Sequence, residues 1–181
     1  MEERAYRLGV LRDGAWSPVD YQNTFGPGWE SALVAAPASH PIDLVFRLME
    51  CGGPYFLIRF ELLEPHGMSY PEGRFDYASP LSRDDIILGL KNKQAALETD
   101  ARLVLDLRDD SGMRIRYDEH NQVLLDGPLA AFEQILLAED FRPGNVDVPF
   151  PHAHHYRDEL TPVFEEWLQP PGWIFSPAEQ G

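Results

Sequence analysis

The chain has a single cysteine, Cys51, among its 181 residues. A lone cysteine excludes an internal disulfide and any metal or iron–sulfur site that requires several thiolates. It is compatible with a reducing compartment, where a small core residue is its ordinary role. A chain of this length buries enough surface to fold without cross-links, so we expect one globular domain over residues 1–181.

Long apolar runs and a signal sequence are also missing. The first residues, MEERAYRLGV, are acidic where a signal peptide would carry basic residues followed by an apolar core. No apolar run approaches the roughly 18 residues that a membrane-spanning helix needs. We therefore predict a cytoplasmic protein that does not bind membranes.

Basic residues are scarce. The chain has 15 Lys and Arg against 30 Asp and Glu, a net charge of −15. Such a surface repels phosphate backbones and anionic lipids, which argues against nucleic-acid partners, but it attracts and steers a basic protein. The excess is strong near the end of the chain, where residues 133–181 contain nine acidic residues and two arginines. The alternative is that the acidic residues only maintain solubility.

Catalytic motifs are absent as well. No Gly-x-Ser-x-Gly is present, and the glycines around Pro27 do not have a phosphate-binding spacing. Paired carboxylates such as Asp84 and Asp85 are adjacent in sequence, which suits turns and helix ends. The sequence therefore favours a protein that is not an enzyme, and we expect no cofactor.

Alternating apolar residues indicate an antiparallel sheet. In residues 55–63, Phe56, Ile58, Phe60 and Leu62 fall on one face, with Arg59 and Glu61 on the other, and residues 101–107, 113–118 and 122–125 alternate around two polar turns. The last three segments predict a three-stranded antiparallel meander, and Asp13-Gly14 predicts a further hairpin turn near the start of the chain. The charged outer face of the meander suits solvent better than a binding surface.

Helical spacing appears between these strands. Residues 42–50 fit either a strand or a helix, and the line of charges at Asp43, Arg47 and Glu50 favours a helix with Ser39 as its N-cap. The other predicted helices are at residues 29–35, after a capping box at Ser82, after an Asp126 cap, and from Tyr156 to Leu168. We predict an α+β domain with helices packed on one face of the sheet.

The most specific chemical pattern is PFPHAHHYRDEL, residues 149–160, with His152, His154 and His155. On an extended segment the first two would share a face, whereas His155 would meet Asp158 or Glu159 only on a helix. These requirements conflict unless the backbone changes after His154, or unless other ligands such as His120, beside Asp118 and Glu119, contribute. We therefore expect no metal ligand here and place the histidines in the first turn of a helix, in acidic surroundings that raise their pKa.

The acidic end of the chain offers a different site. We predict a partner-binding surface with Asp158, Glu159, Glu165 and Glu166 as rim charges and with Trp167 or Trp173 as an apolar anchor. The alternative is that the tail WLQPPGWIFSP packs on the core of its own chain.

These features predict a protein that binds a basic partner. Small, acidic, cytoplasmic chains without catalytic motifs have the profile of bacterial immunity proteins, which cover and neutralise a cognate toxin; the analogy concerns the profile alone. One alternative is a metal-dependent enzyme that acts on a small molecule through His152, His154 and His155. The other is a structural or regulatory interaction domain.

Overall fold

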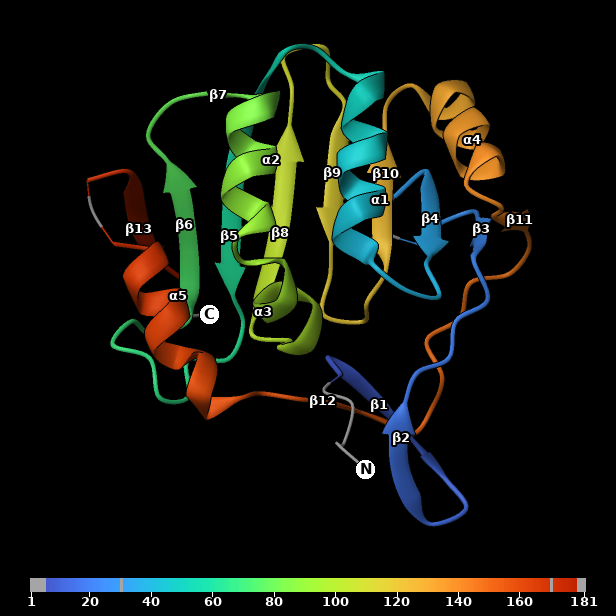
Figure 1. Ribbon diagram of the computed structural model, residues 1–181, viewed down its shortest axis with the longest axis horizontal. Helices are drawn as coiled ribbons and strands as arrows, with labels where there is room; N and C mark the ends of the chain where they lie inside the picture. Colours follow the sequence, from blue (N-terminus) through green and yellow to red (C-terminus); the bar gives the residue numbers. More distant parts are fainter. Residues whose placement is uncertain (1–5, 30, 170, 179–181) are drawn as a thin grey trace.

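A computed structural model describes residues 6–29, 31–169 and 171–178. It has a mixed architecture with two sheets of mainly antiparallel strands and several helices (Figure 1), which agrees with the predicted α+β class. Among the described residues, no helix has the length and apolar character needed to cross a membrane.

The larger sheet has ten strands, of which nine form a continuous row. All its neighbours are antiparallel except β11 and β3, which are parallel. The row runs in the order β11 (Arg142–Pro143), β3 (Thr24–Gly26), β4 (Leu33–Ala36), β10 (Val123–Asp126), β9 (Arg114–Tyr117), β8 (Leu103–Arg108), β5 (Tyr55–Leu62), β6 (Gly73–Tyr77) and β13 (Trp173–Pro177), and the short strand β7 (Leu81–Ser82) pairs with β5.

A second sheet of three strands lies beside one end of the large sheet (Figure 1). Its order is β12 (His152–His154), β1 (Leu8–Arg12) and β2 (Ala15–Pro18), all antiparallel. The turn between β1 and β2 is at Asp13 and Gly14, both with positive φ, as the Asp-Gly pair predicts. His155 ties the two sheets together, because its backbone N–H donates to Arg7 and its carbonyl accepts from Ala101.

Figure 1 shows the helices in front of the large sheet. They are α1 (Pro41–Leu48), which continues as the 3₁₀ turn η1 (Met49–Cys51), α2 (Arg83–Lys91), α3 (Gln94–Thr99), α4 (Leu129–Ala138), the 3₁₀ turn η2 (Asp158–Leu160) and α5 (Thr161–Trp167). Ser82 is the N-cap of α2 as predicted, since its hydroxyl accepts from the Asp85 N–H and donates to the Asp85 carboxylate. Residues 42–50 are helical, as the charge spacing favoured.

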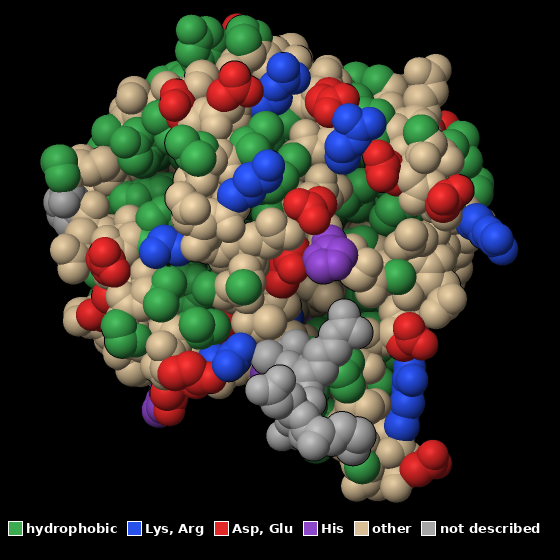
Figure 2. Space-filling view, viewed as in Figure 1, with side chains coloured by type: hydrophobic (Ala, Val, Ile, Leu, Met, Phe, Trp, Pro, Cys, Tyr) green, Lys and Arg blue, Asp and Glu red, His purple; other side chains and the backbone are tan. Residues whose placement is uncertain are grey.

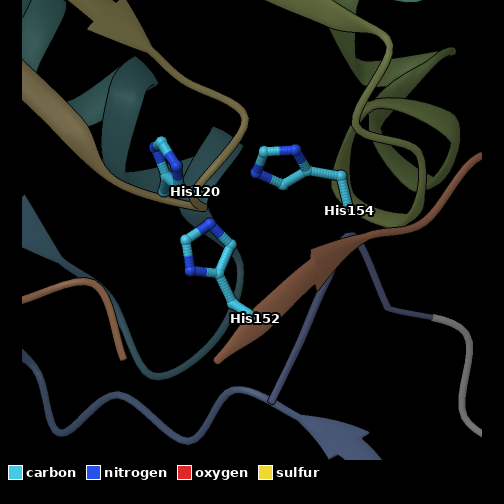
Figure 3. A group of neighbouring side chains, drawn as sticks. All are labelled: His120, His152 and His154. Atoms are coloured by element: carbon cyan, nitrogen blue, oxygen red, sulfur yellow. The ribbon is translucent and has the colours of Figure 1, made fainter. Parts of the chain in front are cut away.

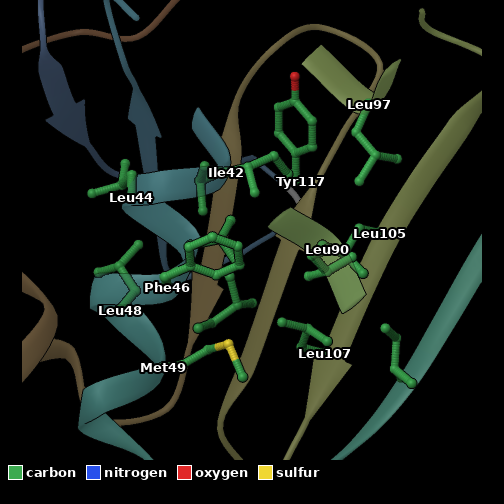
Figure 4. Close-up of a cluster of buried hydrophobic side chains, with 14 of the residues drawn as sticks. Ile42, Leu44, Phe46, Leu48, Met49, Leu90, Leu97, Leu105, Leu107 and Tyr117 are labelled. Carbon is green, nitrogen blue, oxygen red and sulfur yellow. The ribbon is translucent and has the colours of Figure 1, made fainter. Parts of the chain in front are cut away.

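The core lies between these helices and the inward face of the strands. In Figure 4 the apolar side chains of α1, including Ile42 and Phe46, face Leu105, Leu107 and Tyr117 of the sheet. All of these side chains are at most 8% exposed. Alternation along each strand produces this core because every second residue points to the same face.

Three local predictions are wrong. The helix predicted for residues 29–35 does not form, since Leu33 to Ala36 enter the sheet as β4 and are buried on both faces; tertiary burial overrides the weak helical pattern. The N-cap of α1 is His40, not Ser39, and α4 begins after Pro128. Asp126 does not cap α4, since it lies at the end of β10 and accepts a hydrogen bond from the Ala32 N–H.

Candidate metal site

The structure brings three histidines from two distant segments together. His152 and His154 lie on β12, and His120 lies in the turn between β9 and β10. One ring nitrogen from each residue lies within 4.8 Å of the other two. Figure 3 shows the three imidazole rings directed toward a common point between the strand and the turn.

The backbone of β12 explains why two of the rings share this position. The strand pairs with β1, placing His152 opposite Val10 and His154 opposite Leu8. Because side chains two residues apart on a strand point to the same face, both imidazoles face His120. His155 points elsewhere and packs against Tyr6, with ring centroids 4.2 Å apart.

The prediction that these histidines lie in the first turn of a helix is therefore wrong. The segment is extended through His154, and the helical structure begins only at Asp158. The conflict that argued against a metal site disappears, because no helical ligand is needed: His120 supplies the third imidazole. Its position could not be deduced from sequence spacing, since 32 residues separate it from His152.

Asp118 builds the turn that carries His120. One of its carboxylate oxygens accepts hydrogen bonds from the N–H groups of His120 and Gln122, at 3.0 and 2.8 Å. The other oxygen lies 3.2 Å from Nδ1 of His120. Asn121 completes the turn in the left-handed conformation, with φ of 66°. A carboxylate on one ring nitrogen orients the imidazole and leaves the other nitrogen for a ligand.

The His152 ring is oriented in a comparable way. Nδ1 of His152 lies 3.0 Å from the carbonyl oxygen of Pro149, and the protonated Nδ1 of the neutral ring can donate to it. Nε2 of His154 is buried and has no hydrogen-bond partner. A buried polar atom without a hydrogen-bond partner is rare and lowers the stability of the fold. A bound ligand would satisfy this nitrogen.

Electrostatics keeps part of the cluster neutral. The hydrogen bond that His120 donates to the Asp118 carboxylate raises the pKa of His120 despite its partial burial. Burial lowers the pKa of His154, and the neighbouring His120 lowers it further. Only the neutral imidazole offers a lone pair, so His154 is held in the form that binds metals.

Carboxylates lie at the edge of the cluster. Glu119 Oε1 is 3.7 Å from Nδ1 of His120, and Asp118, Glu119 and His120 form a second group whose potential ligand atoms lie within 4.8 Å of one another. A pocket of about 490 Å³ begins here and is lined by all three of these residues.

The predicted partner-binding residues are not part of this site. Asp158 and Glu159 are well exposed, with side chains 77% and 63% accessible, and Glu159 pairs with Arg157. Glu166 is exposed, while Glu165 is half-buried and accepts a hydrogen bond from the Ser69 N–H.

The two tryptophans pack on the core. Trp173 is 8% exposed, and Trp167 is half-buried with its ring 4.6 Å from that of Phe60. Both rings belong to one aromatic cluster with Phe60. This arrangement matches the alternative in which the C-terminal tail covers its own core, and it leaves Trp173 little surface to offer a partner.

Comparison of the chain with protein-family models, with curated proteins and with solved structures finds no match in any of the three.

Proposed function

We propose that this protein binds a transition-metal ion, best matched by zinc, through His120, His152 and His154. The observation that carries the proposal is the convergence of three ring nitrogens within 4.8 Å. Imidazole is a preferred ligand for zinc, copper and nickel, whereas calcium and magnesium prefer oxygen.

The distances fit an ion-free site that closes on binding. Zinc–nitrogen bonds of about 2.0–2.1 Å in a tetrahedral site place the nitrogens roughly 3.4 Å apart. The three nitrogens thus need to approach one another by no more than about 1.4 Å, which small side-chain rotations provide. The contacts of His120 with Asp118 and of His152 with Pro149 are the kind of outer contacts that fix a metal-binding imidazole.

Metal analysis of the untagged protein tests the proposal. We expect about one zinc per chain, and a thermal stabilisation on adding zinc that corresponds to about 2.7 kcal/mol at one hundred times Kd. His120→Asn and His154→Asn should each weaken zinc binding at least about 100-fold, since each removes one of three ligands. His66→Asn is the control, because the His66 side chain is 72% exposed and lies outside the cluster.

Unfolding of the metal-free variants separates loss of a ligand from loss of the fold. A variant that melts with the wild-type metal-free protein but no longer gains stability from zinc supports the proposal. Wild-type protein that gains no stability from zinc, copper or nickel, or variants that bind as tightly as wild type, would contradict it.

Binding of a basic protein through the acidic end of the chain is a second proposal. The observation that supports it is that Asp158, Glu159 and Glu166 are each exposed, on the consecutive elements η2 and α5. A toxin neutralised in the manner of an immunity protein is one such partner. Trp173 is no longer proposed as the apolar anchor, because that residue is buried.

Association kinetics test this second proposal. Neutralising Asp158, Glu159, Glu165 and Glu166 to their amides should slow association with a basic partner more than it speeds dissociation, and should weaken the salt dependence. Amide substitutions at the exposed Asp84 and Asp110 serve as the control. Unchanged rates in the four-residue variant, or an acidic partner, would rule out the electrostatic argument.

The acidic excess is not visible as one continuous patch on the helix-covered side. Figure 2 shows acidic and basic side chains interspersed over that face of the molecule. The proposed electrostatic steering therefore depends on the acidic residues of η2 and α5. The experiment neutralises those residues for this reason.

A further inference from the structure

We infer that a second pocket of the protein binds a small organic cation with an apolar body. The pocket has a volume of about 310 Å³, at the lower end of the range for small-molecule sites. It lies between α2, α5 and the strands β5, β6 and β13, and Figure 1 shows both helices in front of this part of the sheet. None of the described residues that line it belongs to the histidine cluster, so the inference does not depend on the proposed metal site.

Three aromatic side chains form walls of this pocket. Tyr77 and Trp173 lie opposite each other on β6 and β13, with ring centroids 5.2 Å apart and ring planes at 85°. Trp167 of α5 stands at 81° to Trp173, with 6.2 Å between the ring centroids. Because neighbouring rings are nearly perpendicular, they form different walls of one space instead of a single stacked layer. Trp173, which is largely buried, belongs to the inner end of the pocket, and the rings together suit the apolar part of a ligand.

A glycine within α2 keeps the pocket open. Gly89 lines the pocket, although glycine in a helix is less favourable than alanine. A Cβ built at Gly89 would meet no described atom outside its own helix within 4 Å, so close packing does not require a glycine there. Gly172 differs, because a Cβ at that position would lie 2.6 Å from the Tyr77 ring. A larger side chain at Gly89 would instead take up space that a ligand can occupy.

The charge of the pocket indicates the class of ligand. Asp85 is the only charged residue among the described residues of the lining, and it is exposed. One of its carboxylate oxygens accepts a hydrogen bond from the Ser82 hydroxyl, and the other can accept from a ligand. An anion would find no positive side chain in this lining, and the net charge of −15 would repel it. A ligand with its apolar body against the aromatic rings and an ammonium group toward Asp85 matches both parts of the pocket.

Titration with 2-phenylethylammonium at pH 7, followed by the NMR signals of the four tryptophan indole N–H groups, tests the inference. We expect the signals of Trp167 and Trp173 to shift, while those of Trp16 and Trp29, which do not line this pocket, stay in place. The neutral 2-phenylethanol should bind about fivefold more weakly, as expected for the loss of an exposed ion pair. The anionic 3-phenylpropanoate should bind more weakly still.

Two substitutions on α2 test the pocket and its charge separately. Gly89→Leu should weaken binding at least about tenfold because the leucine occupies the pocket, while its melting temperature stays at or above that of wild type, since leucine favours a helix. Gly89→Ala is the control and should bind nearly as tightly as wild type. Asp85→Asn should abolish the preference for the cation over the alcohol, whereas Asp84→Asn, at an exposed neighbour outside this pocket, should preserve it.

The outcomes that would overturn the inference are distinct. They are absence of binding by all three compounds, equal affinity for the cation and the alcohol, and signal shifts confined to Trp16 and Trp29. A Gly89→Leu variant that binds the cation as tightly as wild type would also overturn it, because the ligand would then lie outside this pocket.

Discussion

Replacing Arg7 with alanine is expected to lower the free energy of unfolding by about 4–6 kcal/mol. The Arg7 side chain is fully buried and donates to the carbonyl oxygens of Leu97, Asp100 and Leu103, at 2.5, 3.0 and 2.5 Å. Its guanidinium also lies over the Tyr117 ring, 4.4 Å from the centroid. Alanine would remove one donor from each carbonyl and leave a cavity, and each unsatisfied buried group costs about 1–3 kcal/mol.

Urea unfolding followed by circular dichroism measures this loss. Arg12→Ala, at the exposed end of the strand β1 that follows Arg7, should change stability by less than about 0.5 kcal/mol. Arg7→Lys should give an intermediate value, since an ammonium lacks the planar fork that reaches three carbonyls. A loss below about 1 kcal/mol for Arg7→Ala would show that these hydrogen bonds do not hold the β1 segment to α3 and β8.

Replacing Asp106 with asparagine is expected to cost about 2–4 kcal/mol. Asp106 is 1% exposed and receives hydrogen bonds from Arg108 and Arg114. These two arginines lie directly opposite each other across β8 and β9, where like charges repel. Without the carboxylate, the two positive charges would repel each other with no negative charge between them. The expected loss of stability is smaller than for a fully buried ion pair, because Arg108 is 47% exposed.

The pH dependence of stability provides an independent measurement. Burial alone would raise the pKa of Asp106, but the hydrogen bonds from Arg108 and Arg114 outweigh it and hold the pKa below its usual value. The stability from this carboxylate is therefore complete above the unfolded pKa of about 3.9 and is lost as pH falls through the lower folded pKa. Asp106→Asn should remove that contribution, so its deficit relative to wild type should shrink in acid.

Asp76→Asn is the matched control for Asp106. Asp76 is also shared by two arginines, Arg59 and Arg74, but its side chain is 33% exposed. Solvent screens such a pair, so the loss should be at most about 1 kcal/mol. Equal losses at Asp76 and Asp106 would show that burial does not set the strength of these ion pairs.

The strands at the centre of the large sheet were predictable from the sequence because their information is local. Phe56, Ile58, Phe60 and Leu62 are buried on alternate positions, with Arg59 and Glu61 on the other face. Such a period of two predicts a strand with one face against a core. Strand β4 was not predictable in this way. Leu33 to Ala36 are buried on both faces, so no alternation marks them as a strand.

The histidine cluster was also predictable only in part. The sequence showed that His152 and His154 would share a face if their segment were extended, and it identified His120 as a possible further ligand. Whether the segment is extended depends on β1, which pairs with it from about 140 residues earlier in the chain. Local spacing favoured a helix start that the pairing with β1 prevents.

The sequence by itself determined the composition of the surface, the alternation that builds the sheet and the turn chemistry at Asp13-Gly14 and Ser82, since each depends on neighbours in the chain. Only the tertiary structure decided that His120 meets His152 and His154, that Trp173 lies in the core, and that Asp106 is shared by two arginines. The physical reason is that these contacts form between strands whose pairing depends on burial of the whole core. A pattern within any one segment does not contain that information.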